Sequence, residues 1–218
     1  MFIKICGITV PEDAAAVLEA GADFIGVIHY PKSPRHLTAA AMLPVLHTAE
    51  PFRKRGRKTV LVAADSTTED IIKLLDAVEC KFDYVQIHRE LTEDEYGSIA
   101  ARLNEKHKIQ IIRVVRTLET VQRLFSSSSF SSVPYLLELS HGRLPGGNGK
   151  DWDWSAAKPF CQKFPTLLAG GITPDNVLEA VRQAEPFGID LSSGVELSPG
   201  RKDIEKVRKV ITMVKSII

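Results

Sequence analysis

Short apolar runs alternate with longer amphipathic stretches along almost the whole chain. Eight of the apolar runs have the length of a β-strand, and they cover residues 2–6, 23–29, 59–64, 83–88, 109–115, 133–139, 165–170 and 188–193. Stretches with helical spacing separate them, at 11–21, 38–49, 68–78, 92–106, 118–125, 174–185 and 203–218, with a short, proline-interrupted candidate at 155–164. This alternation predicts a parallel sheet whose strands are joined by crossover helices.

Several predicted helix ends carry residues that favour them. Thr9 precedes a proline and two acidic residues, Thr92 heads the acidic turn TEDE, and Thr173 precedes a proline. Hydroxyl side chains cap the free N–H groups of a first turn, and proline is tolerated there because its missing N–H has no partner to lose. Gly21 follows the first predicted helix, at the position where glycine commonly ends one.

The number and spacing of these units predict the fold class. Eight strand–helix units in 218 residues fit an α/β protein with a single (β/α)₈ TIM barrel, one domain spanning residues 1–218. A doubly wound open sheet is the alternative. The barrel is favoured because no GxGxxG motif follows the first strand and the units are evenly spaced.

Composition narrows the classes of partner. The chain is 44% hydrophobic and 25% charged, as is typical of a globular protein that builds its core without disulfides or metals. Its 28 basic and 27 acidic residues give a formal net charge of +1, so no global field attracts nucleic acid, and we expect none as a partner. The basic run RKRGRK at 53–58 is predicted to be a solvated face, with steering of an anionic substrate as the alternative.

The cysteines and the N-terminus indicate the compartment. Cys6, Cys80 and Cys161 are an odd number without metal-ligand spacing, which is typical of a reducing compartment and predicts no metal site. The chain shows no signal peptide, and no apolar run approaches the roughly 18 residues needed to span a bilayer. We therefore expect a cytoplasmic protein without membrane contact.

In such barrels, chemistry is placed at the carboxyl ends of the strands. The residues that end or follow the predicted strands are polar, small or reactive: Cys6-Gly7, His29, Ala64-Asp65, His88-Arg89, Arg116, Glu138, Gly170-Gly171 and Ser192-Ser193-Gly194. Two of these groups, AGGIT at 169–173 and SSGVE at 192–196, follow the seventh and eighth strands, where barrels often bind phosphate. Glycine allows close backbone approach to an anion, so they predict a phosphate site, with tight turns as the alternative.

Cys6 and Glu138 are the residues at these ends best suited to proton transfer. A thiol at the barrel mouth can be ionised by nearby positive charge, for which Lys4 and Arg35 are candidates, although a free cysteine is also commonly a small buried hydrophobe. Glu138 follows the apolar run VPYLL, and a carboxyl in an apolar setting can keep its proton and act as a general acid. The alternative for Glu138 is a solvated carboxylate.

Several motifs in order along the chain are similar to those of the phosphoribosylanthranilate isomerase family. They are KICGIT (4–9), PEDA (11–14), AGAD (20–23), YPKSPRHL (30–37), VQIH (85–88), GGNGKDWDW (146–154), LAGGITPDNV (168–177) and DLSSGVE followed by PG and KD (190–203). The resemblance implies a barrel that converts N-(5′-phosphoribosyl)anthranilate to 1-(2-carboxyphenylamino)-1-deoxyribulose 5-phosphate by an Amadori rearrangement. This is the third step of tryptophan biosynthesis from chorismate.

The resemblance also assigns roles to residues. It implies Cys6 as the base, Glu138 as the acid and Arg35 as the ligand of the anthranilate carboxylate, without cofactor or metal. The phosphate would lie on Gly170, Gly171, Ser193 and Gly194, and His88 of VQIH is a further substrate-binding candidate. The implied partner is a small phosphorylated substrate, bound by a monomer or a homodimer.

Three departures from the family pattern leave alternatives open. The family has Leu-Leu-Asp where this chain has Leu137-Glu138, and one extra methylene moves a carboxyl by about 1.5 Å. A misplacement of that size can cost on the order of 100-fold in rate. His29 and Arg89 add bulk and charge at the expected mouth, and Asp65 is an uncertain site residue. An isomerase of a related aminoaldose phosphate and a non-catalytic phosphate-metabolite binding barrel are therefore the alternatives.

Overall fold

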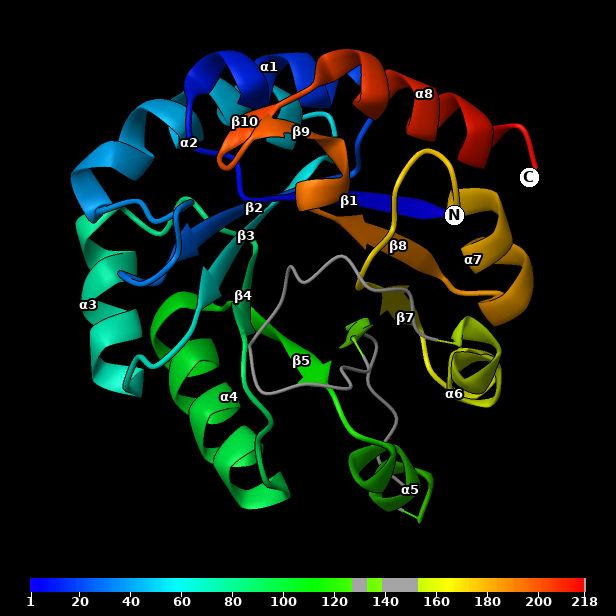
Figure 1. The fold of residues 1–218 in the computed structure, drawn as a ribbon. Coiled ribbons are helices and arrows are strands. Elements are labelled where there is room, and N and C mark those ends of the chain that lie inside the picture. The colour runs from blue at the N-terminus through cyan, green and yellow to red at the C-terminus, as the bar shows by residue number, and fades with distance from the viewer. Residues whose placement is uncertain (127–132, 139–152, 218) are drawn as a thin grey trace.

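A closed barrel of parallel strands forms the centre of the protein (Figure 1). The computed structural model describes residues 1–126, 133–138 and 153–217. The barrel strands are β1 (Phe2–Cys6), β2 (Phe24–His29), β3 (Lys58–Ala63), β4 (Tyr84–Ile87), β5 (Gln110–Val115), β6 (Tyr135–Leu137), β7 (Thr166–Leu168) and β8 (Gly188–Leu191). They pair in chain order, and β8 closes the ring on β1, with Phe2 opposite Gly188. The predicted TIM barrel is confirmed, and the open sheet is excluded.

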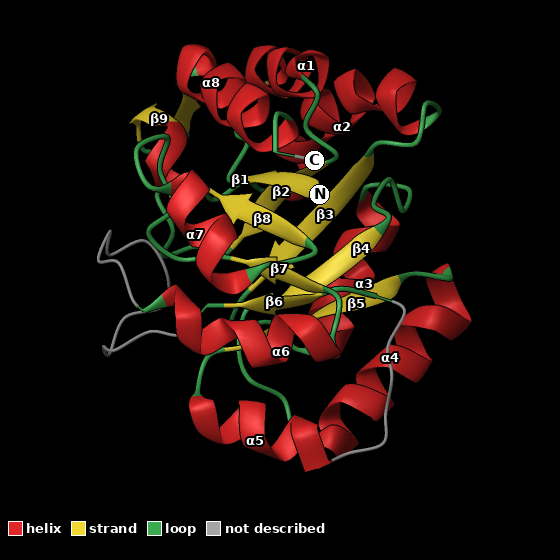
Figure 2. Ribbon diagram, turned by 90° about the vertical axis from the view of Figure 1, so that its right-hand side faces the viewer, coloured by secondary structure: helices red, strands yellow, loops and turns green. Residues whose placement is uncertain are grey.

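Helices surround the strands on the outside (Figure 2). They are α1 (Pro11–Ala20), α2 (Ala39–Arg53), α3 (Thr68–Ala77), α4 (Glu93–His107), α5 (Leu118–Ser126), α6 (Lys158–Lys163), α7 (Val177–Ala184) and α8 (Ile204–Lys215), with short 3₁₀ turns η1 (Trp154–Ala157) and η2 (Ser193–Val195). None of the helices in these described ranges is long and apolar enough to cross a membrane. Residues 127–132 and 139–152, which hold Leu139 of the sixth predicted strand and most of the motif GGNGKDWDW, lie outside the described residues.

The alternation of side chains along each strand separates two apolar layers. Ile3 and Ile5 of β1 are buried between the sheet and the helices. Cys6 instead belongs to the cluster inside the barrel, together with residues such as Val62 and Leu136. Because successive side chains of a strand point to opposite faces, Lys4 shares the inner face with Cys6. This places the last residue of β1 at the inner mouth of the barrel.

The first helix begins at residue 11 as predicted, but Thr9 does not cap it, and the start predicted at 174 is wrong. Competing contacts account for both differences. Val10, and not Thr9, is the N-cap of α1, and the Thr9 hydroxyl donates to the Gly200 carbonyl instead. Helix α7 begins at Val177 rather than 174, because the side-chain oxygen of Asn176 accepts the N–H of Thr173 at 2.7 Å and holds a turn there.

Other helix ends agree with prediction or extend it. Thr92 forms a capping box with Glu95, and Gly21 ends α1 in the left-handed region at φ 107°. Helix α2 continues to Arg53, past its predicted end at 49 and past Pro51. Pro51 has no N–H to donate, but the Lys54 N–H still closes the last turn on the Glu50 carbonyl at 3.2 Å.

The segment between β8 and α8 contains a hairpin that the pattern did not predict. Its strands are β9 (Glu196–Ser198) and β10 (Arg201–Lys202), which pair antiparallel. The basic run at 53–58 lies between α2 and the start of β3, at the end of the barrel opposite the strand carboxyl ends. Arg53 and Lys58 there donate to Asp83, so the run pairs locally, and its position does not suit steering of a substrate to the barrel mouth.

Candidate active site

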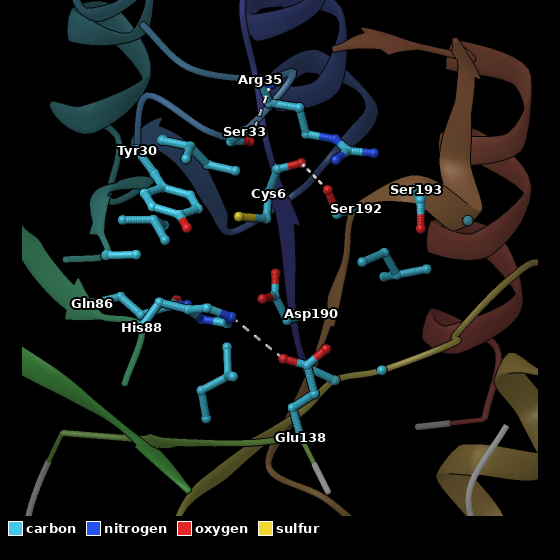
Figure 3. Close-up of a pocket in the computed structure, with 18 of the residues that line it drawn as sticks. Cys6, Tyr30, Ser33, Arg35, Gln86, His88, Glu138, Asp190, Ser192 and Ser193 are labelled. Carbon is cyan, nitrogen blue, oxygen red and sulfur yellow. Dashed lines mark hydrogen bonds and ion pairs between the residues drawn. The ribbon is translucent and has the colours of Figure 1, made fainter. Parts of the chain in front are cut away.

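A pocket of about 440 Å³ opens at the carboxyl ends of the barrel strands (Figure 3). Cavities of this size suit small-molecule ligands. All eight residues that the sequence singled out for the site line it: Cys6, Arg35, His88, Glu138, Gly170, Gly171, Ser193 and Gly194. They come from six different segments of the chain, so the closed barrel brings them together.

Cys6 lies at the end of β1 and is only 7% exposed. A Cβ atom on the neighbouring Gly26 would come within 2.8 Å of the Cys6 sulfur, so glycine on β2 makes room for the thiol. Burial raises the pKa of Cys6, against the charge of Lys4, which lowers it. The positive charge expected near Cys6 is therefore present, but its effect on the pKa of the thiol is smaller than that of burial.

Lys4 is fully buried below Cys6 and is paired with Asp190 of β8. Its ammonium donates to Asp190 Oδ2 at 2.9 Å. The other oxygen, Oδ1, is buried and has no hydrogen-bond partner among the described residues. Asp190 lines the pocket between Cys6 and Glu138 (Figure 3). Sequence reasoning missed this residue, although an aspartate inside the apolar strand GIDL was a signal that could have found it.

Glu138 follows β6 on the opposite side of the pocket from Cys6, and it is 9% exposed. Burial raises its pKa, with Arg116 opposing, so the carboxyl has the environment of a general acid. His88 Nε2 lies 3.6 Å from Glu138 Oε2. Burial, Arg116 and Lys4 lower the pKa of His88 to about 4, so at neutral pH the imidazole is uncharged and this contact is not an ion pair.

Gln86 is a second residue that the sequence reasoning missed on this side. Its amide nitrogen lies 3.2 Å from His88 Nδ1. If the amide donates there, the imidazole proton lies on Nε2 and faces Glu138. Gln86 belongs to the motif VQIH and points inward from β4, so the alternation of the strand was the available signal.

Arg35 sits in the loop after β2, and its guanidinium is already engaged on one edge. Nε and Nη2 donate to the two oxygens of Glu196 at 2.8 and 2.6 Å. The side chain passes over Gly7, where a Cβ atom would come within 2.5 Å of the Arg35 Cδ. The glycine after Cys6 therefore allows the arginine to reach the pocket.

The two glycine loops after β7 and β8 abut each other. Gly170 and Gly171 adopt the left-handed region at φ 92° and 69°. A Cβ atom on Gly194 would lie 2.0 Å from the Ile172 carbonyl oxygen, so only glycine permits this approach. The N–H groups of Gly170 and Gly171 donate to no other described residue, which leaves them available to an anion in the pocket.

His29, Arg89 and Asp65 do not line the pocket. His29 Nδ1 lies 3.0 Å from the Leu37 carbonyl oxygen, and Arg89 is paired with Glu95 at 3.1 Å. The Asp65 side chain is 66% exposed. The departures that motivated a different aminoaldose phosphate as substrate therefore point away from the site.

Comparison with known proteins agrees with this geometry. Residues 3–213 match the family model of N-(5′-phosphoribosyl)anthranilate isomerase. A curated relative of that name from Trichormus variabilis is 37% identical, with 95% of each chain covered. The phosphoribosylanthranilate isomerase structure from Thermotoga maritima superposes with a TM-score of 0.82 at 30% identity, covering 99% of both chains. Another solved isomerase, in complex with reduced 1-(o-carboxyphenylamino)-1-deoxyribulose 5-phosphate, has a TM-score of 0.79 at 30% identity and the same coverage.

Proposed function

Because the chain belongs to the N-(5′-phosphoribosyl)anthranilate isomerase family, we propose that this pocket performs the family's reaction with Cys6 as base and Glu138 as acid. The reaction is the Amadori rearrangement of N-(5′-phosphoribosyl)anthranilate to 1-(2-carboxyphenylamino)-1-deoxyribulose 5-phosphate in tryptophan biosynthesis. The observation that carries the assignment is the placement of Cys6 and Glu138 on two sides of one pocket.

Two proton transfers account for the chemistry. Neutral Glu138 donates its proton to the ring oxygen, the C1′–O bond breaks toward oxygen, and the nitrogen lone pair forms the C=N bond of a Schiff base. The Cys6 thiolate then takes the proton from C2′, and the C–H electron pair moves to give an enolamine, which tautomerises to the ketone. The raised pKa of Glu138 supports its role as proton donor near neutral pH.

The remaining pocket residues suit the two anionic ends of the substrate. The phosphate lies against Gly170, Gly171, Ser193 and Gly194, where close-packed glycines and N–H groups that have no partner among the described residues support anion binding. Arg35 binds the anthranilate carboxylate, because a planar guanidinium matches a carboxylate with two parallel hydrogen bonds. His88 lines the pocket beside Glu138 and contacts the sugar between these ends.

The proposal extends to the compartment, the partners and the oligomeric state of the enzyme. We expect a reducing cytoplasmic compartment, because Cys6, Cys80 and Cys161 are an odd number without metal-ligand spacing. The substrate is a small phosphorylated molecule, and the near-balanced charge does not favour nucleic acid as a partner. We expect a monomer or a homodimer, which light scattering would distinguish.

Turnover of freshly prepared phosphoribosylanthranilate tests the proposal, together with growth of a tryptophan auxotroph that lacks this step. We expect turnover and rescue of growth. Tight binding of the reduced product analogue without turnover, not restored by Glu138→Asp, would contradict it and favour a binding protein that has lost its acid.

A further inference from the structure

The hairpin β9–β10 holds two buried charges that the reaction described above does not use. Glu196 is 9% exposed and Lys202 is 3% exposed, and neither lines the pocket. Burying charged side chains is costly unless they are paired and hydrogen-bonded. Their partners therefore indicate what the hairpin does.

The Glu196 carboxylate gathers donors from three sides. Arg35 donates to both of its oxygens, the Lys202 ammonium donates to Oε1 at 2.6 Å, and the Gly200 N–H donates to the same oxygen at 3.3 Å. Burial alone would raise the pKa of Glu196, but the hydrogen bonds from Arg35 and Lys202 lower it, so it stays ionised. The Glu196 carboxylate, which does not line the pocket itself, thus holds the guanidinium of Arg35 in place.

The way in which Glu196 holds Arg35 leaves one edge of the guanidinium open. Nε and Nη2 form the side edge, and both donate to Glu196. The end edge, formed by Nη1 and the second N–H of Nη2, can still make two parallel bonds to another carboxylate. Nη1 has no hydrogen-bond partner in the described part of the chain, and Arg35 lines the pocket.

Lys202 changes the net charge of the cluster that it forms with Arg35 and Glu196. Arg35 and Glu196 alone would cancel, and a neutral pair would attract an incoming anion weakly. Lys202 adds a second positive charge at 2.6 Å from Glu196, so the three together carry a net positive charge. Burial lowers the pKa of Lys202, and its hydrogen bond to Glu196 opposes that effect.

The hairpin is itself anchored beside the phosphate loops. The Lys202 ammonium also donates to the Ser192 carbonyl at 3.3 Å, and the Lys202 N–H donates to Asp13 of α1 at 2.8 Å. The Thr9 hydroxyl holds the hairpin turn at Gly200. Glu196 is therefore placed on an element tied to β8 and α1, and not on a free loop.

We propose that Glu196 and Lys202 are positioning residues for the substrate carboxylate: Glu196 presents the end edge of Arg35 to the pocket, and Lys202 restores the positive charge that Glu196 would cancel. The proposal rests on the proposed function, in which Arg35 binds the anthranilate carboxylate. It accounts for Glu196, Gly200 and Lys202 of the motif that follows DLSSG, which the proton-transfer steps leave without a role.

The test compares two ligands by isothermal titration calorimetry. One is reduced 1-(o-carboxyphenylamino)-1-deoxyribulose 5-phosphate, and the other is the same molecule without the carboxyl group. We expect the wild-type protein to prefer the carboxylated ligand and Glu196→Gln to lose about tenfold of that preference, since a charge-assisted contact is misplaced. Lys202→Met is expected to lose about threefold, and less in high salt because the effect acts through charge. Affinity for the ligand without the carboxyl group is expected to change less than affinity for the carboxylated ligand in both variants.

Lys209→Met is the matched control, because it removes an exposed charge of α8 that contacts Asp175 and not Glu196. Its preference is expected to equal that of the wild type. If Glu196→Gln keeps the wild-type preference for the carboxylated ligand, the positioning proposal is overturned and the proposed function stands. Should Glu196→Gln fail to unfold cooperatively, Glu196→Asp, which retracts the carboxylate by one methylene, replaces it in the same comparison of the two ligands. A wild-type protein without any preference overturns the role of Arg35 and the proposal with it.

Discussion

The Cys6 side of the pocket is built around a buried ion pair, whereas on the other side Glu138 makes a looser contact with an uncharged histidine. Lys4 and Asp190 lie 2.9 Å apart below the thiol, on adjacent strands that close the barrel. Across the pocket, His88 and Glu138 lie 3.6 Å apart, and the imidazole is uncharged. The base is therefore positioned by strand register, while the acid depends on side-chain length and tautomer. The departure from the family pattern at Glu138 falls on the side with more freedom to accommodate it.

Breaking the tight side is expected to have the largest effect on folding. Lys4→Met leaves the Asp190 carboxylate buried without its counterion, and removing one partner of a buried pair costs about 3–5 kcal/mol. Urea denaturation measures this loss. Lys106→Met, which removes an exposed partner of Asp76, is the control and is expected to change little. An unchanged midpoint for Lys4→Met would show that the pair contributes nothing to stability.

Shortening the acid tests the looser side. Glu138→Asp retracts the carboxyl by about 1.5 Å from His88 and from the centre of the pocket. We expect kcat to fall by about 10- to 100-fold, because the site is built around the longer side chain. Steady-state kinetics with the natural substrate measure it, and binding of the product analogue checks that the pocket is intact. A higher kcat for Glu138→Asp would mean that glutamate is a poor fit here.

The pH dependence reports both sides at once. Burial raises the pKa of Glu138 above its usual value near 4.3, and it raises that of Cys6 above its usual value near 8.5. The reactive form needs Glu138 protonated and Cys6 ionised. Because the usual pKa of glutamate lies below that of cysteine, this form is most populated between the two pKa values. The profile of kcat/KM is therefore expected to be bell-shaped, with an acid limb at the pKa of Glu138, an alkaline limb at the pKa of Cys6, and both limbs displaced upward. Glu138→Asp should move the acid limb and leave the alkaline limb in place. An acid limb that stays unmoved would assign it to another group.

The smallest effects are expected for residues that lie outside the pocket. His29→Ala and Arg89→Ala change residues that bond to the Leu37 carbonyl and to Glu95 and do not line the pocket. Their kcat/KM should stay within about twofold of wild type, as for most surface substitutions. A larger change with the natural substrate would restore them as determinants of substrate choice.

Local pattern was enough to predict the barrel and most of the residues at its mouth. The run FIKIC predicted β1 with its observed bounds, and the register then placed Cys6 in the pocket. Asp190 was missed because its partner Lys4 is 186 residues away in the sequence, and only closure of β8 on β1 brings them together. The same limit applies to the false cap at Thr9, whose hydroxyl is taken by Gly200, 191 residues later.

Long-range contacts also set the orientation of the Arg35 guanidinium, which no local pattern indicated. The family resemblance implied Arg35 as the ligand of a carboxylate, but not that Glu196 would occupy one edge of the guanidinium. Glu196 reaches it from 161 residues away, through a hairpin of short strands with little periodicity. The positions of single residues at the pocket were thus predictable, and the charge networks that surround them were not.

The central claim is that Cys6 and Glu138 supply the two proton transfers, and the turnover number of substituted enzymes tests it most directly. We predict that Cys6→Ser and Glu138→Gln each lower kcat for phosphoribosylanthranilate by about 10²- to 10⁴-fold, the range for loss of a general acid or base, while both still bind the reduced product analogue. Either variant turning over the substrate within a few-fold of wild type would contradict the account.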